Sequence, residues 1–205
     1  MKTSRAITRR RFINHAAAVA GAAPLILSSR LWAAETPPNS QITLGFIGLG
    51  TQGAGLLRGF LQRDDTRVLA VCDVDTTRRN NAKGIVEARY ASDLKGGTYE
   101  GCAAYNDLNE LLARKDIDGV VIATPDHWHA LISIAAARAG KDVYCEKPMS
   151  HTIQEGRAMV NAVRVHGRIL QVGSMQRSMT EFRTACELVR NGAIGKVVRA
   201  EVAVG

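Results

Sequence analysis

A run of glycines directly after an apolar segment constrains the fold of this chain more than any other feature. The residues that follow the apolar run Ile42–Ile47 are Gly48, Leu49, Gly50, Thr51, Gln52 and Gly53. Glycines at this spacing are weak evidence alone, but between a strand and an amphipathic helix they form the turn that binds a dinucleotide. Gly48 allows the tight turn, Gly50 the close approach of the pyrophosphate, and Gly53 the close packing of helix on strand. The N–H groups of the following helix start then face the phosphates.

Short apolar runs alternate with amphipathic stretches beyond this turn. Strands that are apolar on both faces are typical of a buried parallel sheet, and strand–helix alternation builds right-handed βαβ units. We therefore predict an α/β fold, a doubly wound parallel Rossmann sheet, over residues 42–174. The expected strands are Ile42–Ile47, Val68–Cys72, Gly119–Ala123, Asp142–Cys145 and Ile169–Val172.

The helices are expected between these strands, and some of their starts carry a recognisable cap. The expected helices are Gln52–Arg63, Thr76–Ala91, His129–Ala139 and Thr152–Val165. The spacing of a capping box predicts three helix starts, at Asp107 with Glu110, Thr152 with Glu155 and Ser178 with Glu181. The polar, glycine-containing stretch Ser92–Ala104 is expected to be a loop.

Asp73 stands twenty residues after Gly53, at the end of the second expected strand. A carboxylate at that position accepts hydrogen bonds from the adenosine ribose and repels a 2′-phosphate, which predicts NAD in preference to NADP. Arg78 and Arg79 lie within reach and weaken this preference without reversing it. The alternative is that Asp73 only caps the next helix.

The first forty residues are typical of a targeting segment. Thr8-Arg9-Arg10-Arg11-Phe12 precedes the twelve-residue, alanine-rich run Ala16–Leu27. This layout predicts a secretory signal, and the paired arginines resemble a twin-arginine signal; a membrane span needs roughly 20 apolar residues. We expect residues 1–34 to be this signal, 35–41 to be a linker, and the protein to be periplasmic or secreted through the twin-arginine export machinery. A basic disordered tail is the alternative.

Most of the formal net charge of +8 lies in the same segment. Residues 1–40 contain six of the 27 Lys and Arg residues and one of the 19 Asp and Glu residues, so the rest of the chain carries only +3. The charge therefore indicates no nucleic-acid partner. The four cysteines form no Cys-x-x-Cys pair, which argues against a zinc knuckle. Cys72 and Cys145 fall in apolar runs and are expected to be buried free thiols.

Two further stretches resemble the Gfo/Idh/MocA family of oxidoreductases. They are Ala123-Thr124-Pro125-Asp126-His127-Trp128-His129 and Val143-Tyr144-Cys145-Glu146-Lys147-Pro148. Weaker similarity extends the resemblance over residues 42–205, and Glu-Lys-Pro is its most specific motif. The resemblance implies an NAD(P)-dependent enzyme that transfers hydride between a hydroxyl carbon of a sugar or cyclitol and the nicotinamide.

The resemblance also implies roles for single residues. Lys147 is the expected catalytic residue, with Glu146 beside it at a strand end, where open α/β sheets bind ligands. Thr124 and Pro125 are expected to line the cofactor, and His129 to lie near the nicotinamide ribose. The residues expected to bind cofactor are Gly48, Leu49, Gly50, Thr51, Gln52, Gly53, Asp73, Arg78, Thr124, Pro125, His129, Glu146, Lys147 and Arg177.

Alternatives stay open for two of these residues. Arg177 is placed by the resemblance near the cofactor carboxamide or the substrate, and a solvated surface arginine is the other interpretation. His127 and His129 could form a metal pair, but no third ligand stands out, and no metal is expected.

Residues 175–205 are expected to connect to a second, α+β substrate domain and to supply only its start. This part comprises a helix over Glu181–Asn191, a turn, and a first strand over Lys196–Val204. In the family that domain supplies an Asp and a His to the proton relay and often builds the oligomer interface. We therefore expect a truncated chain that forms homo-oligomers only in a full-length form. An NAD-dependent glycosidase using transient sugar oxidation and an inactive cofactor-binding fragment are the alternatives.

Overall fold

Six parallel strands form one sheet in the order β3-β2-β1-β4-β5-β6. The computed structural model describes residues 41–92 and 101–203 of the chain. The strand order reverses beside β1, so the predicted doubly wound Rossmann sheet is confirmed. The strands are β1 (Ile42–Ile47), β2 (Thr66–Cys72), β3 (Ala103–Tyr105), β4 (Gly119–Ile122), β5 (Asp142–Glu146) and β6 (Leu170–Gly173).

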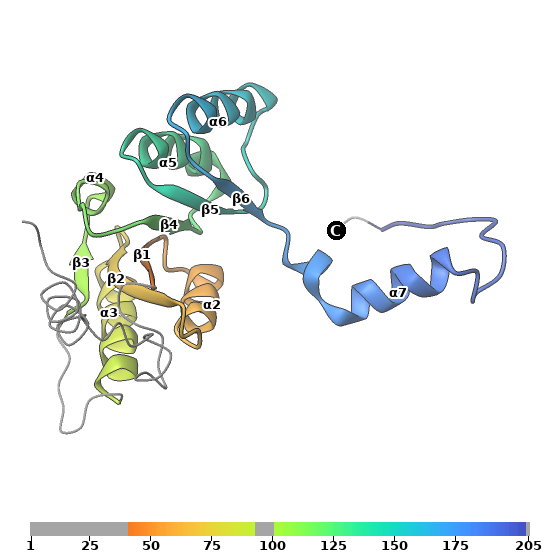
Figure 1. Ribbon diagram of the computed structural model, residues 1–205, viewed down its shortest axis with the longest axis horizontal. Helices are drawn as coiled ribbons and strands as arrows, with labels where there is room; N and C mark the ends of the chain where they lie inside the picture. The colour runs from red at the N-terminus through yellow and green to blue at the C-terminus, as the bar shows by residue number, and fades with distance from the viewer. Residues whose placement is uncertain (1–40, 93–100, 204–205) are drawn as a thin grey trace, which may run out of the picture. The chain divides into compact units, whose positions relative to one another are not determined.

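Helices cover both faces of this sheet. Figure 1 shows α5 and α6 on one face and α2 and α3 on the other. The helices are α2 (Thr51–Phe60), α3 (Thr76–Ala91), α4 (Leu108–Leu112), α5 (Asp126–Arg138), α6 (Ile153–Val165) and α7 (Thr180–Arg190), with a 3-10 helix, η3, at Met175–Ser178.

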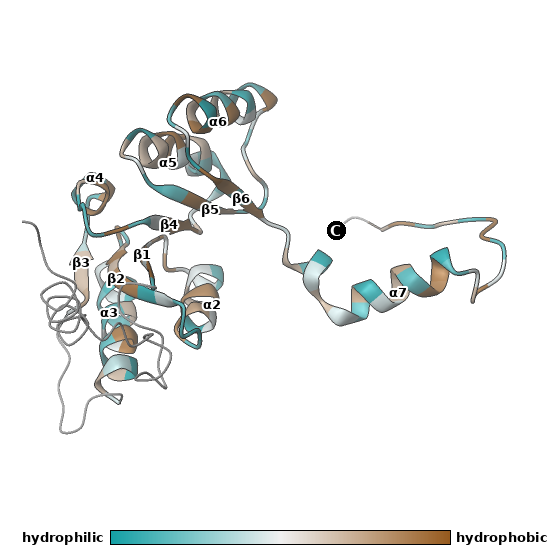
Figure 2. Cartoon of the chain, viewed as in Figure 1, coloured by the Kyte–Doolittle hydropathy of each residue, from teal (hydrophilic) through white to brown (hydrophobic). Residues whose placement is uncertain are grey.

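Two hydrophobic cores lie on opposite faces of the sheet because successive strand side chains point in opposite directions. Phe46 and Val121 face α2 and α3 in one core. Ile47 and Ile122, their neighbours in sequence, face α4, α5 and α6 in the other. All four side chains are at most 3% exposed, and the strands β4 and β6 are correspondingly brown in Figure 2. The continuous apolar runs of the sequence are therefore explained by burial on both sides.

The element between β2 and β4 differs from the prediction. Residues 93–100 of the expected loop lie outside the described residues, but Ala103 and Ala104 belong to strand β3, which pairs with β2. The three residues of β3 are too few to show an alternation of apolar and polar side chains, so the sequence does not predict a strand there. Pairing with β2 decides their conformation. The helix α4 begins at Leu108, with Asp107 as its cap.

The three predicted capping boxes have different outcomes. Thr152 and Glu155 form a complete box at the start of α6. Asp107 accepts the N–H of Asn109 and so caps α4 by its own side chain. The prediction at Ser178 is wrong, because the 3-10 helix η3 includes Ser178 and α7 has Met179 as a cap without a side-chain hydrogen bond.

The predicted strand over Lys196–Val204 is not formed in residues 196–203. A strand needs a hydrogen-bonded neighbour, and none of the described residues pairs with this segment. Helix α7 is amphipathic, yet none of its residues is buried. Within the described part of the chain, no helix combines the length and the apolar character that crossing a membrane requires.

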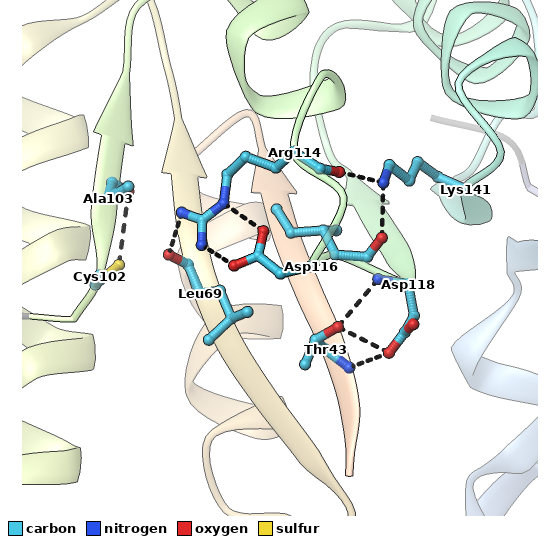
Figure 3. A network of polar contacts seen from close by, with 9 residues as sticks. Thr43, Leu69, Cys102, Ala103, Arg114, Asp116, Asp118 and Lys141 are labelled. Atoms are coloured by element: carbon cyan, nitrogen blue, oxygen red, sulfur yellow. Dashed lines mark hydrogen bonds and ion pairs between the residues drawn. The ribbon is translucent and has the colours of Figure 1, made fainter. Parts of the chain in front are cut away.

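A polar network closes the end of the sheet at which the strands begin (Figure 3). Lys141 is 4% exposed, and its ammonium donates to the carbonyl oxygens of Arg114 and Ile117. The guanidinium of Arg114 donates to the carbonyl of Leu69 and to Asp116. Burial lowers the pKa of Lys141, and the nearby charge of Lys115 adds to this effect. The network supplies donors to carbonyl groups that the strands and turns leave unpaired.

Candidate active site

The glycine turn is closed by contacts that leave no room for side chains at two positions. Gly48 has a φ of +88°, and a Cβ on it would stand 2.7 Å from the backbone carbon of Ala123. A Cβ on Gly53 would stand 2.0 Å from the carbonyl oxygen of Gly48. Real Cβ atoms do not approach backbone so closely, so both glycines are required by the packing of α2 on β1 and β4.

Gly50 is a different case, because it borders open space. Among the described residues, the only atom within 4 Å of a Cβ built on Gly50 is Nη1 of Arg78, at 3.8 Å. Gly50 is also the N-cap of α2, and it has no side chain to cap the free N–H groups. The first turn of α2, which contains Thr51 and Gln52, carries no acidic residue. The helix start therefore offers unpaired N–H groups and a positive dipole end to an anion.

Asp73 fixes the glycine turn to the end of β2. Its Oδ2 accepts the N–H of Leu49 at 2.6 Å, and its Oδ1 accepts the N–H of Asp75 at 2.9 Å. The cap of α3 is Asp75, whose carboxylate accepts the N–H of Arg78, so Asp73 is free of that role. The side chain of Leu49 is 4% exposed and belongs to the core. Leu49 therefore contributes to the turn through its backbone N–H.

The two adjacent arginines of α3 have different surroundings. Arg79 donates to the carbonyl of Asp73 and to the side chains of Asn106 and Thr76. Arg78 lines the cavity in front of Gly50. Of the two cations that the sequence placed near Asp73, Arg78 lines the cavity and Arg79 does not.

A cavity of about 550 Å³ opens at the end of the sheet where the strands finish. It is bordered by Gly48, Gly50, Thr51, Gln52, Cys72, Asp73, Val74, Arg78, Asn106, Leu108, Thr124, Pro125 and Trp128, among others. Most polar members of this set come from the turns after β1, β2, β3 and β4. Asn106 and Trp128 were absent from the predicted site; the rule that ligands bind beyond the carboxyl ends of strands would have found Asn106 once β3 was recognised.

Two cavity residues have unusual surroundings. Among the described residues, the Thr124 hydroxyl oxygen is buried without a hydrogen-bond partner. Such an orphaned group is costly unless a ligand satisfies it. Cys72 is a buried free thiol, and burial together with the charge of Asp73 raises its pKa to about 11. The thiol is therefore protonated and unreactive at neutral pH.

Glu146 links the end of β5 to the glycine turn. It is 3% exposed; its Oε1 accepts Nε2 of Gln52 at 3.0 Å, and its Oε2 accepts the N–H of Lys147 at 3.1 Å. Burial raises the pKa of the Tyr144 hydroxyl, and the charge and hydrogen bond of Glu146 add to this effect. A Cβ on Gly173 would stand 2.7 Å from Glu146, so β6 also closes over this carboxylate. Glu146 is thus a buried anchor next to the cavity.

Lys147 follows Glu146 directly and has an exposed side chain at the same end of the sheet. Its amine forms no ion pair within the described residues, and Lys147 is not among the residues that border the cavity; its catalytic role stays a prediction. Arg177 lies apart from this group. It belongs to η3 and borders a different hollow of about 500 Å³, formed with residues of α7 such as Phe182 and Arg183.

His129 is not among the residues that border the cavity, and its position near the cofactor ribose stays a prediction. Its ring is 1% exposed and contacts two carbonyl oxygens, with Nε2 at 2.9 Å from Thr124 and Nδ1 at 2.6 Å from Pro148. Both nitrogens are therefore engaged by backbone. No group of three His, Cys, Asp or Glu side chains suited to a metal occurs in residues 41–92 and 101–203.

These features fit a dinucleotide. A phosphate group is complementary to the free N–H groups of α2, because Gly50 leaves the approach open. Asp73 and Arg78 stand at the end of β2, where the adenosine ribose of such a ligand lies in folds of this topology. The orphaned Thr124 hydroxyl offers a donor and an acceptor to the same ligand. The site has the features of a dinucleotide-binding site of the Rossmann class.

Comparison with known proteins specifies the family. The family described as "Oxidoreductase family, NAD-binding Rossmann fold" (GFO_IDH_MocA) matches residues 42–174. The chain is 32% identical over 196 residues to a "Glycosyl hydrolase family 109 protein" of Stenotrophomonas maltophilia, which covers 96% of this chain and 42% of the relative. The chain belongs to the Gfo/Idh/MocA family, and residues 42–174 form its NAD-binding Rossmann domain.

Solved structures give the same result. A myo-inositol 2-dehydrogenase of Lactobacillus plantarum is similar with a TM-score of 0.65 and 27% identity, covering 77% of this chain and 43% of that one. A scyllo-inositol dehydrogenase of Lactobacillus casei, crystallised with NAD(H) and scyllo-inositol, is similar with a TM-score of 0.64 and 25% identity over 76% of this chain and 43% of that one. The chain spans about two fifths of the length of the curated relatives it matches.

Proposed function

We propose that this chain is the cofactor-binding part of an NAD-dependent oxidoreductase that acts on a hydroxyl carbon of a sugar or cyclitol. The observation that carries the proposal is the cavity beyond the strand ends, where the free start of α2, Asp73 and the orphaned Thr124 hydroxyl converge. Relatives named as inositol dehydrogenases support the substrate class. A nicotinamide bound in this cavity would supply the hydride acceptor for the carbon of the alcohol, and the hydroxyl proton would pass to a base as the carbonyl group forms.

The residues of this chain have separate tasks in that reaction. Gly48, Gly50 and Gly53 shape the turn that receives the pyrophosphate. The amine of Lys147 hydrogen-bonds the reacting hydroxyl and orients it as its proton leaves. Glu146 accepts the N–H of Lys147 and the amide of Gln52, and so holds the lysine against the glycine turn.

The cofactor preference follows from the end of β2. Both oxygens of Asp73 accept backbone N–H groups, so the carboxylate is held in place. A fixed negative charge repels a 2′-phosphate, and the neighbouring cation Arg78 offsets this repulsion in part. We therefore propose that NAD binds more tightly than NADP, with a modest ratio of affinities.

A second function is favoured by the names of the relatives. The chain is 30–32% identical to proteins named glycosyl hydrolase family 109. A glycosidase that oxidises its sugar transiently would use the same cavity and the same hydride step, and it would add acid and base groups for the leaving group. The two functions share every residue described above.

The experiment that tests the proposal is a titration of the purified chain with NAD and NADP. Trp128 borders the cavity and reports binding by fluorescence, and a Trp32→Phe background removes the other tryptophan. Saturable NAD binding that weakens at least about tenfold in Asp73→Ala, a loss of about 1.4 kcal/mol, is expected. Absence of binding by a folded chain refutes the cofactor assignment; binding without turnover of any polyol or glycoside identifies an inactive cofactor-binding fragment.

We also propose export through the twin-arginine pathway. The support is the sequence of residues 8–12, which lie outside the described residues. The test is the location of the full chain in bacterial cells, with Arg9→Lys and Arg10→Lys introduced together as the matched variant. Export of the original chain and retention of the double variant are expected, and equal export of both contradicts the proposal.

A further inference from the structure

His129 joins two loops that are distant in sequence. It is the fourth residue of α5, and its ring lies between the carbonyl oxygens of Thr124 and Pro148. Thr124 belongs to the loop between β4 and α5, which borders the cavity. Pro148 belongs to the loop between β5 and α6, residues 147–152, which carries Lys147. We call these the cavity loop and the lysine loop.

The chemistry of imidazole explains why histidine suits this place. A carbonyl oxygen buried away from water needs a donor. Each ring nitrogen of His129 faces one of the two carbonyl oxygens, and the tautomer sets which of them receives the N–H. An apolar side chain of the same size would offer no donor to either carbonyl. The ring itself is 1% exposed.

Among the described residues, a weaker polar contact joins the start of α5 to the lysine loop. Oδ2 of Asp126 lies 3.7 Å from Nδ1 of His151, and these side chains are 43% and 62% exposed. Exposed pairs of this kind contribute little because water screens them. The lysine loop is also packed on α6, where a Cβ on Gly156 would stand 2.8 Å from Cε of Met149. That contact fixes the loop to its own helix, while Met149 also packs against the core that α5 shares. Among the polar contacts between the described residues, the His129 ring gives the buried link between the two loops.

We propose that His129 is a positioning residue, which ties the lysine loop to the cavity loop and thereby sets where the Lys147 amine stands beside the cofactor. The proposal rests on the proposed function for the meaning of that position, but the tie itself is a property of the fold. In this proposal the ring of His129 contacts backbone carbonyl groups of the two loops and does not contact the cofactor.

The test compares two variants of His129 with a matched control. His129→Phe keeps a planar ring and removes both ring nitrogens, and His129→Gln keeps an amide donor. The control is His127→Phe on the same helix, whose side chain is 60% exposed and contacts neither loop carbonyl. Hydrogen exchange of the peptide 146–152 is compared with that of β4, so that local opening is separated from global unfolding.

Two results are expected from the full chain. Exchange of the peptide 146–152 becomes about fivefold to thirtyfold faster in His129→Phe, the range for loss of one or two hydrogen bonds, while β4 is unchanged and His129→Gln recovers part of the protection. Modification of the Lys147 amine by a small acylating reagent, read by mass spectrometry, is slowed by NAD in the original chain and in His127→Phe. That protection is lost in His129→Phe.

Three outcomes overturn the inference. They are exchange of the peptide 146–152 that is unchanged in His129→Phe, exchange that rises equally in β4, and Lys147 modification that NAD never slows although NAD binds. Failure of the original chain to bind NAD is a separate result, because it refutes the proposed function while the exchange data still decide whether His129 ties the two loops.

Discussion

The two ends of the parallel sheet handle their polar groups in opposite ways. Where the strands begin, Lys141, Arg114 and Asp116 are paired with one another or with backbone carbonyls. Where the strands finish, the start of α2 has no cap, and the Thr124 hydroxyl has no partner among the described residues. The first end is satisfied by the chain itself, and the second is completed by a ligand. The difference shows that stability and binding are divided between opposite edges of one sheet.

The largest effect is expected at Gly53. In Gly53→Ala the new Cβ collides with the carbonyl of Gly48, so the turn must open. We expect NAD affinity to fall by at least about a hundredfold and the free energy of unfolding to fall by about 1–3 kcal/mol.

Gly55→Ala on the same helix is the control, because nothing lies within 4 Å of a Cβ there. This substitution should raise the free energy of unfolding by about 0.5–1 kcal/mol, as alanine favours a helix interior. NAD titration and urea unfolding measure both variants. Equal NAD affinity in the two would show that the turn does not depend on the close approach at Gly53.

Lys141→Met removes a buried donor at the opposite end of the sheet, where the strands begin. Two buried carbonyl groups lose their donor, and the free energy of unfolding should fall by about 2–4 kcal/mol, while the Kd for NAD stays within about twofold. Lys115→Met, at an exposed lysine, should change stability by less than about 0.5 kcal/mol. A large change in NAD affinity on loss of Lys141 would mean that the two ends are coupled.

Thr124→Val tests the same comparison through two smaller effects, a gain in stability without ligand and a loss of NAD affinity. Removing a hydroxyl without a partner should stabilise the protein without ligand by about 0.5–1 kcal/mol and weaken NAD binding about fivefold. Thr43→Val is the matched change at the other end, where the hydroxyl donates to Asp118 at 2.7 Å. It should cost about 1 kcal/mol and leave NAD binding unchanged. Destabilisation by Thr124→Val would show that this hydroxyl is satisfied in the ligand-free protein.

The smallest effect concerns pH. The hydrogen bond from Arg114 lowers the pKa of Asp116 below its ordinary 3.8, and the charge of Arg114 adds to this. The stabilisation from this pair is therefore complete above the ordinary pKa and is lost as the pH falls below 3.8. Asp116 is 57% exposed, so the difference between the original chain and Asp116→Asn should be under about 1 kcal/mol. Urea unfolding from pH 7 to pH 3 measures this difference in the free energy of unfolding. A difference that grows towards low pH would contradict the predicted pH dependence.

Local sequence patterns predicted most of the architecture. Strand β1 and helix α3 were predicted with the residues they have, because burial on both faces and a regular helical pattern leave a strong periodic signal. Strand β3 was missed, since its three residues are strand only through pairing with β2. The predicted strand after residue 195 is not formed, since a strand pattern without a partner does not determine a strand.

Local patterns also predicted several of the residues that gather at the candidate site. They did not predict the direction in which each side chain points. The glycine turn, Asp73, Thr124 and Pro125 come together around one cavity. The sequence could not show that His129 turns towards two carbonyl groups, nor that Arg177 borders a hollow with α7. Both facts depend on loops that approach one another only in the folded chain.

The sequence alone determined the class of this protein, because the glycine spacing and the alternation of strands with helices are local consequences of backbone geometry. Only the tertiary structure decided how the site residues divide their work. Asp73 fixes the turn, Arg78 lines the cavity while Arg79 supports the backbone, Glu146 holds Gln52, and His129 joins two loops. The reason is physical: a motif specifies which groups are present, and their hydrogen-bond partners come from segments that meet only when the sheet has formed.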